Sequence, residues 1–144
     1  MLKKSLVFTI TAIVAIVADQ YVKTVILGGF RWQSEYISII FVLNDGVAFS
    51  MLSFLQSYLK YIQIALLLFG IVYCASIGYI RKYALELGLI FGSGISNIYD
   101  RFMYGGVVDY VYYHHWFDFA VFNLADVLID IGVLLIIIKL LKKK

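Results

Sequence analysis

Four apolar runs constrain the fold of this chain more than any other feature. They cover about residues 5–27, 58–80, 83–99 and 119–138. A helix of about 20 apolar residues is long enough to cross a bilayer. The chain has 144 residues, of which 63% are hydrophobic and only 15% charged, which is typical of membrane proteins and not of soluble domains. The sequence therefore predicts an all-α membrane protein with four transmembrane helices, built as a single domain over residues 1–144.

Basic residues mark one end of every predicted span. Lys3 and Lys4 precede the first, Arg81 and Lys82 separate the second from the third, and four lysines follow residue 138. The positive-inside rule places these residues, and both termini, in the cytoplasm. The first run is long and has no clear Ala-x-Ala cleavage site after it, so we expect a retained helix. Basic residues at span ends indicate topology and give no reason to expect nucleic-acid binding.

Two loops then lie on the outer side, at about residues 28–57 and 100–118, and both are rich in aromatic residues. Aromatic side chains suit the interface between membrane and water. Residues 35–43 are β-branched and aromatic, and a turn sequence follows at residues 44–46. This pattern predicts one or two short strands. We therefore expect a small extracytoplasmic β-element beside the helices.

Nearly all the polar residues of the apolar part of the chain fall at the outer ends of the spans or in the outer loops. They are Asp19, Lys23, Asn44, Asn97, Asp100, Arg101, Asp109, Asn123 and Asp126. A charged side chain at the centre of a membrane helix costs roughly 2.5–3.5 kcal/mol on insertion scales. The predicted orientation of the spans rests only on the basic residues at their opposite ends. The polar residues therefore gather on one side independently of that prediction, which indicates one functional site.

Several of these residues have structural interpretations. Asp19 and Lys23 lie at i,i+4 and form either an ion pair that lowers the cost of two buried charges or a contact to substrate. For Arg101 beside Asp100, we favour an interfacial salt bridge. Asp130 lies one turn beyond Asp126 and fits a proton path or a polar contact equally well.

Other catalytic chemistries have little support. His114 and His115 are adjacent, so their side chains point apart, and no third ligand for a metal site is evident. Ser93 and Ser96 lie among small residues, without the glycine-framed turn of a nucleophilic serine. Cys74 is the only cysteine, which excludes an intramolecular disulfide.

The remaining candidates for chemistry are Asp109 and Asp126. Two carboxylates in a poorly solvated site cannot both ionise at low cost, so they share one proton. The ionised member then takes a proton from water while the protonated member donates to a substrate carbonyl or leaving amine. This hydrolysis needs no metal or cofactor. Spacing alone leaves open whether Asp100 or Asp109 is the partner of Asp126.

The polar residues occur in short motifs, in a fixed order from residue 19 to residue 126. The motifs are Asp19-x-x-x-Lys23, Asn44-x-Gly46-x-Ala48-Phe49, Asn97-x-x-Asp100-Arg101, Val107-Val108-Asp109-Tyr110 and Phe122-Asn123-x-Ala125-Asp126. Together they resemble the successive motifs of the lipoprotein signal peptidase (signal peptidase II) family.

The resemblance implies an aspartic endopeptidase of the bacterial inner membrane, with its active site near the periplasmic face. Its substrates would be prolipoproteins that carry diacylglycerol on a cysteine, cut just before that cysteine. Membrane lipids and inhibitory cyclic peptides of the globomycin type are the other partners that it implies.

The motifs also imply residue roles. Asp109 and Asp126 take the positions of the catalytic dyad, and Asp19 with Lys23 takes a structural position. Five further residues take dyad-supporting or substrate-positioning places: Asn44, Asn97, Asp100, Arg101 and Asn123.

Two non-enzymatic interpretations compete with this one. A small proton or ion pathway would use Asp19, Asp126 and Asp130, because intramembrane carboxylates mark such routes. A pathway needs polar residues across the full depth of the membrane, and the inner half has almost none beyond Asp130. A purely structural assembly subunit would tolerate Asp109→Asn.

Overall fold

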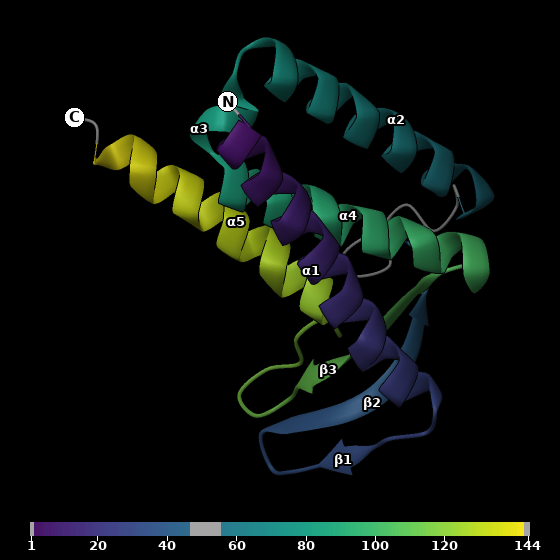
Figure 1. The fold of residues 1–144 in the computed structure, drawn as a ribbon. Coiled ribbons are helices and arrows are strands. Elements are labelled where there is room, and N and C mark those ends of the chain that lie inside the picture. Colours follow the sequence, from purple (N-terminus) through teal and green to yellow (C-terminus); the bar gives the residue numbers. More distant parts are fainter. Residues whose placement is uncertain (1, 47–55, 143–144) are drawn as a thin grey trace.

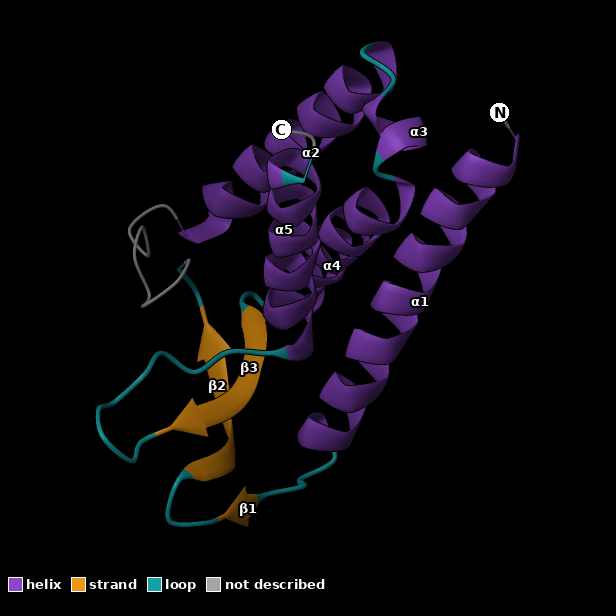
Figure 2. Cartoon of the chain, turned by 90° about the vertical axis from the view of Figure 1, so that its left-hand side faces the viewer, coloured by secondary structure: helices purple, strands orange, loops and turns teal. Residues whose placement is uncertain are grey.

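The protein is mostly helical, with one small sheet at one end of the helices (Figures 1 and 2). The computed structural model describes residues 2–46 and 56–142, and for residues 56 and 57 the backbone alone. Its elements in chain order are α1 (Leu2–Leu27), β1 (Trp32–Gln33), β2 (Ile37–Asn44), α2 (Gln56–Ser76), α3 (Tyr79–Lys82), α4 (Ala84–Met103), β3 (Val107–Tyr113) and α5 (Leu124–Leu141).

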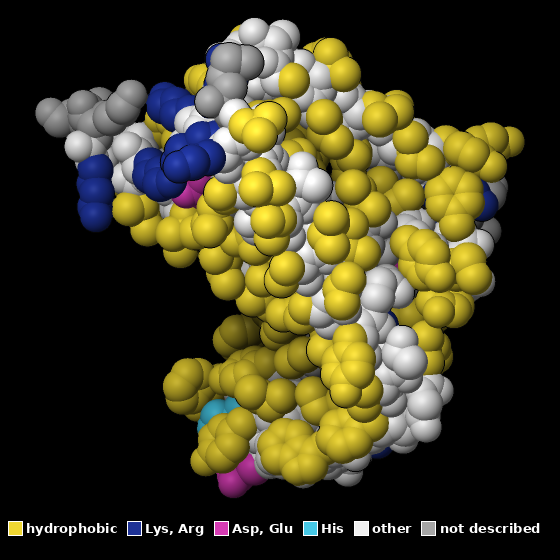
Figure 3. Space-filling model, in the orientation of Figure 1, with side chains coloured by type: hydrophobic (Ala, Val, Ile, Leu, Met, Phe, Trp, Pro, Cys, Tyr) yellow, Lys and Arg dark blue, Asp and Glu magenta, His cyan; other side chains and the backbone are white. Residues whose placement is uncertain are grey.

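Helix α4 is the centre of the helical part, and it packs mainly against α1 and α5, with α2 on a further side (Figure 1). The outer surface of the helices is largely hydrophobic (Figure 3). Within the described residues, α1 and the 58–76 part of α2 are long and apolar enough to cross a membrane. Helices α4 and α5 are similarly apolar, but each carries three charged residues.

Close contact between α1 and α4 depends on small residues. A Cβ atom added to Gly92 would lie 2.5 Å from the backbone oxygen of Ala12, and one added to Gly88 would lie 2.8 Å from that of Phe8. In lipid, helices associate through packing of this kind, because apolar burial gives no drive for association. The glycine and serine spacing of residues 88–96 therefore brings α4 close enough to α1 for their polar side chains to meet.

We expect Gly92→Ala to destabilise the protein by about 1–3 kcal/mol, because the new methyl group meets backbone that cannot move alone. The measurement is the thermal unfolding midpoint in detergent. Gly70→Ala is the matched control, since its new methyl group would meet ring atoms of Phe91 at 3.2 and 3.3 Å, and a ring can shift. Equal midpoints for the two variants would contradict this account of the α1–α4 contact.

Three predicted helix boundaries are wrong. The second helix does not continue to residue 80: α2 ends at Ser76, and Gly78, with a φ of 75°, separates it from the short α3. The third helix does not stop at residue 99 but continues to Met103. The fourth begins at Leu124 and not at residue 119, because Asn123 caps it. Run length alone detects neither a left-handed glycine nor a capping side chain.

The sheet is antiparallel, in the order β1-β2-β3. The strand predicted within residues 35–43 is confirmed as β2, and its pairing with β1 completes the predicted β-element. Strand β3 was not predicted, although it is also β-branched and aromatic. The pairing of Val42 with Asp109 joins the two loops that the sequence predicts on the outer side, and it carries Asp109 to the ends of the helices. Ala48 and Phe49 of the second motif, and Lys143 and Lys144, lie outside the described residues.

Candidate active site

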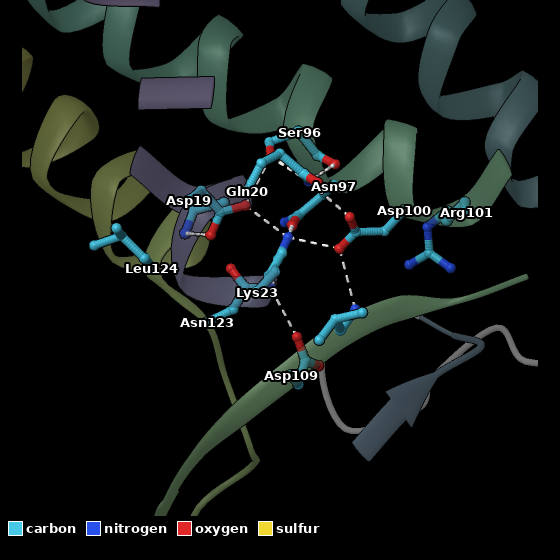
Figure 4. A network of polar contacts seen from close by, with 12 residues as sticks. Asp19, Gln20, Lys23, Ser96, Asn97, Asp100, Arg101, Asp109, Asn123 and Leu124 are labelled. Carbon is cyan, nitrogen blue, oxygen red and sulfur yellow. Dashed lines mark hydrogen bonds and ion pairs between the residues drawn. The ribbon is translucent and has the colours of Figure 1, made fainter. Parts of the chain in front are cut away.

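Lys23 is the centre of a buried polar network between α1 and α4 (Figure 4). Its Nζ atom lies 2.7 Å from Oδ2 of Asp19 and 2.7 Å from Oδ2 of Asp100, and it donates to Oδ1 of Asn97 at 2.8 Å. The side chains of Lys23, Asp19 and Asp100 are completely buried. One ammonium group therefore compensates two carboxylates, and all three of its N–H groups have an acceptor.

Two further residues belong to this network, although the sequence analysis does not predict them as site residues. The hydroxyl group of Ser96 donates to Oδ2 of Asp19 at 2.7 Å, and Nε2 of Gln20 donates to Oδ1 of Asp100 at 2.7 Å. Gln20 lies three residues before Lys23, so it shares the polar side of α1, a signal that could have identified it. Ser96 was noted only for its small size. The network as a whole fixes the rotation of α1 against α4.

The expected salt bridge between Arg101 and Asp100 is wrong. Arg101 points away from Asp100 and donates to the backbone oxygens of residues 44, 45 and 46, at the end of β2 (Figure 4). Asp100 instead pairs with Lys23 and accepts from the backbone N–H of Val108 at 3.1 Å. Sequence neighbours on a helix point about 100° apart, so adjacency did not make them partners. Arg101 thus anchors the sheet to α4.

The start of α5 is held by three different parts of the chain. The backbone N–H groups of residues 124, 125 and 126 donate, in that order, to Oη of Tyr110, Oδ1 of Asp19 and Oδ1 of Asn123, at 2.9, 2.9 and 3.0 Å. A capping box is completed by the backbone N–H of Asn123, which donates to Oδ2 of Asp126. Asp126 therefore lies in the first helical turn, and not seven residues inside a helix that starts at residue 119.

Asp109 and Asp126 are joined through asparagine side chains. Asn123 Nδ2 donates to Oδ1 of Asp109 at 2.7 Å, and Asn44 Nδ2 donates to Oδ2 of the same carboxylate at 2.9 Å. Asn97 Nδ2 donates to Oδ1 of Asp126 at 2.9 Å. Each carboxylate thus accepts from two N–H groups, which fixes its orientation. Asn123 contacts both carboxylates, through its side chain and its backbone N–H group, and so links them directly.

Burial raises the pKa of Asp109 from 3.8 to about 6. Hydrogen bonds from Asn44 and Asn123 act in the opposite direction, because they stabilise the ionised form, while the charge of Asp126 raises the pKa further. Asp109 therefore holds its proton at pH values where an exposed aspartate is ionised.

Both carboxylates line one cavity of about 520 Å³ at the junction of the helices and the sheet. The polar part of its lining also includes Asn44, Asn97 and Arg101, and the apolar part includes Phe119, Phe122, Val127 and Ile129. Asp19, Lys23 and Asp100 lie behind this lining, without exposed surface. The fold thus brings all nine predicted site residues into one network, and it is Asp109, not Asp100, that lies in the cavity with Asp126. Figure 3 shows the surface hollowed between the helices and the sheet.

The two histidines lie on the sheet side. Nε2 of His114 is 2.8 Å from Oγ of Ser38, and the ring of His115 is 4.3 Å from that of Tyr36. No group of three or more His, Cys, Asp or Glu side chains that could hold a metal ion occurs within residues 2–46 and 56–142.

Comparison with known families decides what kind of protein carries this arrangement. The family model described as Signal peptidase (SPase) II matches residues 11–142. The chain belongs to the signal peptidase II family. The predicted family and the prediction of a signal peptidase are thereby confirmed, and both argue against the non-enzymatic interpretations.

Relatives in the signal peptidase II family are similar over most of their length. The lipoprotein signal peptidase of Helicobacter acinonychis (strain Sheeba) is 53% identical over 122 residues, which are 84% of this chain and 78% of that protein. That of Campylobacter jejuni (serotype O:6) is 47% identical over 133 residues, 92% and 85% of the two chains. A solved structure described as a bacterial membrane enzyme superposes with a TM-score of 0.77 at 29% identity and covers 94% of this chain and 87% of its own.

Proposed function

We propose that this protein removes signal peptides from diacylglyceryl-modified prolipoproteins by cutting just before the lipidated cysteine. The observation that carries the proposal is the position of Asp109 and Asp126 in one largely apolar cavity, linked through Asn123. Membership of the signal peptidase II family supports the substrate class, since relatives bear the name lipoprotein signal peptidase.

In the proposed mechanism, Asp109 carries the shared proton and Asp126 is ionised. Asp126 takes a proton from a water molecule, whose oxygen forms a bond to the scissile carbonyl carbon, while Asp109 donates its proton to the carbonyl oxygen. The tetrahedral intermediate then loses the amine of the cysteine, which leaves with a proton from Asp126, and Asp109 recovers its own. The asparagines hold both carboxylates in place throughout. The two carboxyl groups carry every proton transfer, so the proposed mechanism needs no metal or cofactor.

We further propose that α1, α2, α4 and α5 all cross the bacterial inner membrane, with both termini in the cytoplasm. Basic residues support this orientation: Lys3, Arg81, Lys82 and Lys139 gather at the end of the helices away from the sheet (Figures 1 and 3). The sheet and the cavity then lie at the periplasmic face, where a lipid-anchored cysteine is held by its acyl chains. The aromatic and aliphatic lining of the cavity suits membrane lipids, prolipoproteins and globomycin-type cyclic peptides.

The direct test is a cleavage assay with purified protein in detergent and two forms of one prolipoprotein, with and without the diacylglyceryl group. We expect cleavage of the lipidated form only, with a new N-terminus at the modified cysteine by mass spectrometry and no effect of a chelator. Equal cleavage of both forms would contradict the proposed substrate class, and cleavage at another bond would contradict the proposed position.

The proposed mechanism also predicts a pH dependence. Because Asp109 must be protonated, kcat/KM is expected to fall as the pH rises through about 6, the pKa of this carboxyl group. Asn44→Ala removes a hydrogen bond to the ionised form, so it raises the pKa of Asp109 and moves the fall to higher pH. The measurement is kcat/KM against pH for both proteins. A fall that moves to lower pH in the variant would be inconsistent with a protonated Asp109.

A further inference from the structure

The cavity continues beyond the two carboxylates, along α5. Its lining includes Asp126, Ile129 and Asp130, which lie at i, i+3 and i+4 and so share one side of the helix. Asp130 is one turn further from the sheet than Asp126, or about 6 Å at 1.5 Å per residue. Gln63 of α2 also lines the cavity. The cavity thus extends along α5 from the sheet end toward the basic end of the helices, and we call this part, lined by Gln63, Ile129 and Asp130, the arm.

Gln63 differs from the other amides of the site. Its Oε1 atom is buried, yet it accepts no hydrogen bond from any described residue. In contrast, the side chains of Asn44, Asn97 and Asn123 all bond to the network. Buried carbonyl oxygens without a partner are rare and unfavourable, so each requires an explanation. For one on a residue that lines the substrate cavity, a ligand that brings the missing donor is such an explanation.

The chemistry of this arm favours one kind of ligand. An acyl chain has no hydrogen-bond donor and would leave Gln63 unsatisfied. An extended peptide, however, carries N–H groups that need acceptors wherever water is excluded. In the proposed orientation, the signal peptide reaches Asp109 and Asp126 from the cytoplasmic direction, which is the direction of this arm.

We propose that Gln63 is a substrate-positioning residue, whose Oε1 atom accepts a hydrogen bond from a backbone N–H of the signal peptide just before the scissile bond. This inference rests on the proposed function, because it requires a signal peptide as substrate. Gln63 takes no part in proton transfer. It holds the unwound end of the signal peptide against α5, so that the scissile bond lies between the carboxylates.

The test combines a protein variant with changes in the substrate backbone. Each of the three peptide bonds before the scissile bond is replaced in turn by an ester, which removes one N–H group. With wild-type protein, one ester is expected to lower kcat/KM by about 10-fold, the effect of one lost hydrogen bond to a buried acceptor. Gln63→Leu is expected to cause a similar loss with the all-amide substrate, mainly through KM. That one ester should then cause no further loss in the variant.

Matched controls separate this role from a structural one. Leu68, five residues along α2 and so on a different side of this helix from Gln63, is 56% exposed, so Leu68→Gln should leave kcat/KM unchanged. In the double variant Gln63→Leu with Leu68→Gln, the carboxamide lies on the wrong side of α2 and should not restore activity. Ester effects of the same size in wild type and Gln63→Leu would overturn the proposal, as would Gln63→Leu with normal kcat/KM. If wild-type protein fails to cleave even the all-amide substrate, it is the proposed function that fails.

Discussion

Replacing either Asp109 or Asp126 by asparagine is expected to abolish cleavage while the protein stays folded. An amide cannot take a proton from water or donate one to the substrate in the required cycle, and losing general acid–base catalysis at either position should lower kcat by about 1,000-fold or more. Asparagine has nearly the same shape as aspartate. Each native carboxylate accepts from two N–H groups, and asparagine keeps one acceptor, so the loss of stability should be only about 1 kcal/mol.

The measurements are single-turnover cleavage of a lipidated substrate and the unfolding midpoint of each variant. Asp118→Asn is the matched control, because Asp118 is exposed on the loop between β3 and α5, where its carboxylate accepts a hydrogen bond from Tyr112. This variant should cleave normally. Normal turnover in Asp109→Asn or Asp126→Asn would exclude the dyad. Activity that survives Asp109→Asn but is lost in Asp100→Asn would assign the role to Asp100.

The largest effect on stability is expected for Lys23→Met. This change leaves Asp19 and Asp100, both fully buried, without the ammonium group that lies 2.7 Å from each. Removing one partner of a buried ion pair typically costs 3–5 kcal/mol, and here two carboxylates lose their partner, so we expect a loss of at least about 4 kcal/mol. Poor yield and a strongly lowered unfolding midpoint in detergent are the expected observations.

Compensating and control variants make this prediction specific. Adding Asp19→Asn and Asp100→Asn to Lys23→Met removes the uncompensated charges and should recover part of the lost stability. Lys60→Met is the control, because Lys60 lies over the ring of Phe102 at 4.7 Å near the surface of α2, and its loss should cost about 1 kcal/mol or less. If Lys23→Met and Lys60→Met unfolded at the same temperature, the buried network would not be a source of stability.

Helices and the main strand could be predicted because their signals are local. Apolar run length located α1 and most of α2 and α4, and β-branched residues located β2. The missed features depend on single side chains or on distant partners. Asn123 starts α5 five residues later than the apolar run suggests, since its side chain bonds to the backbone of Asp126. Strand β3 forms because β2 lies beside it, and that pairing cannot be read from either loop alone.

The site was predictable in outline for a different reason. Charges are costly in an apolar protein, so the few that the sequence keeps are expected to meet, and they do. Individual partners were not predictable, because they depend on how each helix is rotated about its axis. Lys23 reaches Asp100 across the α1–α4 contact, whereas Arg101, the sequence neighbour of Asp100, reaches the end of β2. Gln63 is not predictable from the sequence, because a single glutamine in an apolar run has no motif around it.

Asn123 has a consequence that extends beyond the polar network. The same side chain begins α5 and bonds to Asp109, while its backbone bonds to Asp126. Fraying of one helical turn therefore separates the two acids, even if every other helix stays intact. On warming, we expect such a protein to stop cleaving its substrate before its other helices unfold.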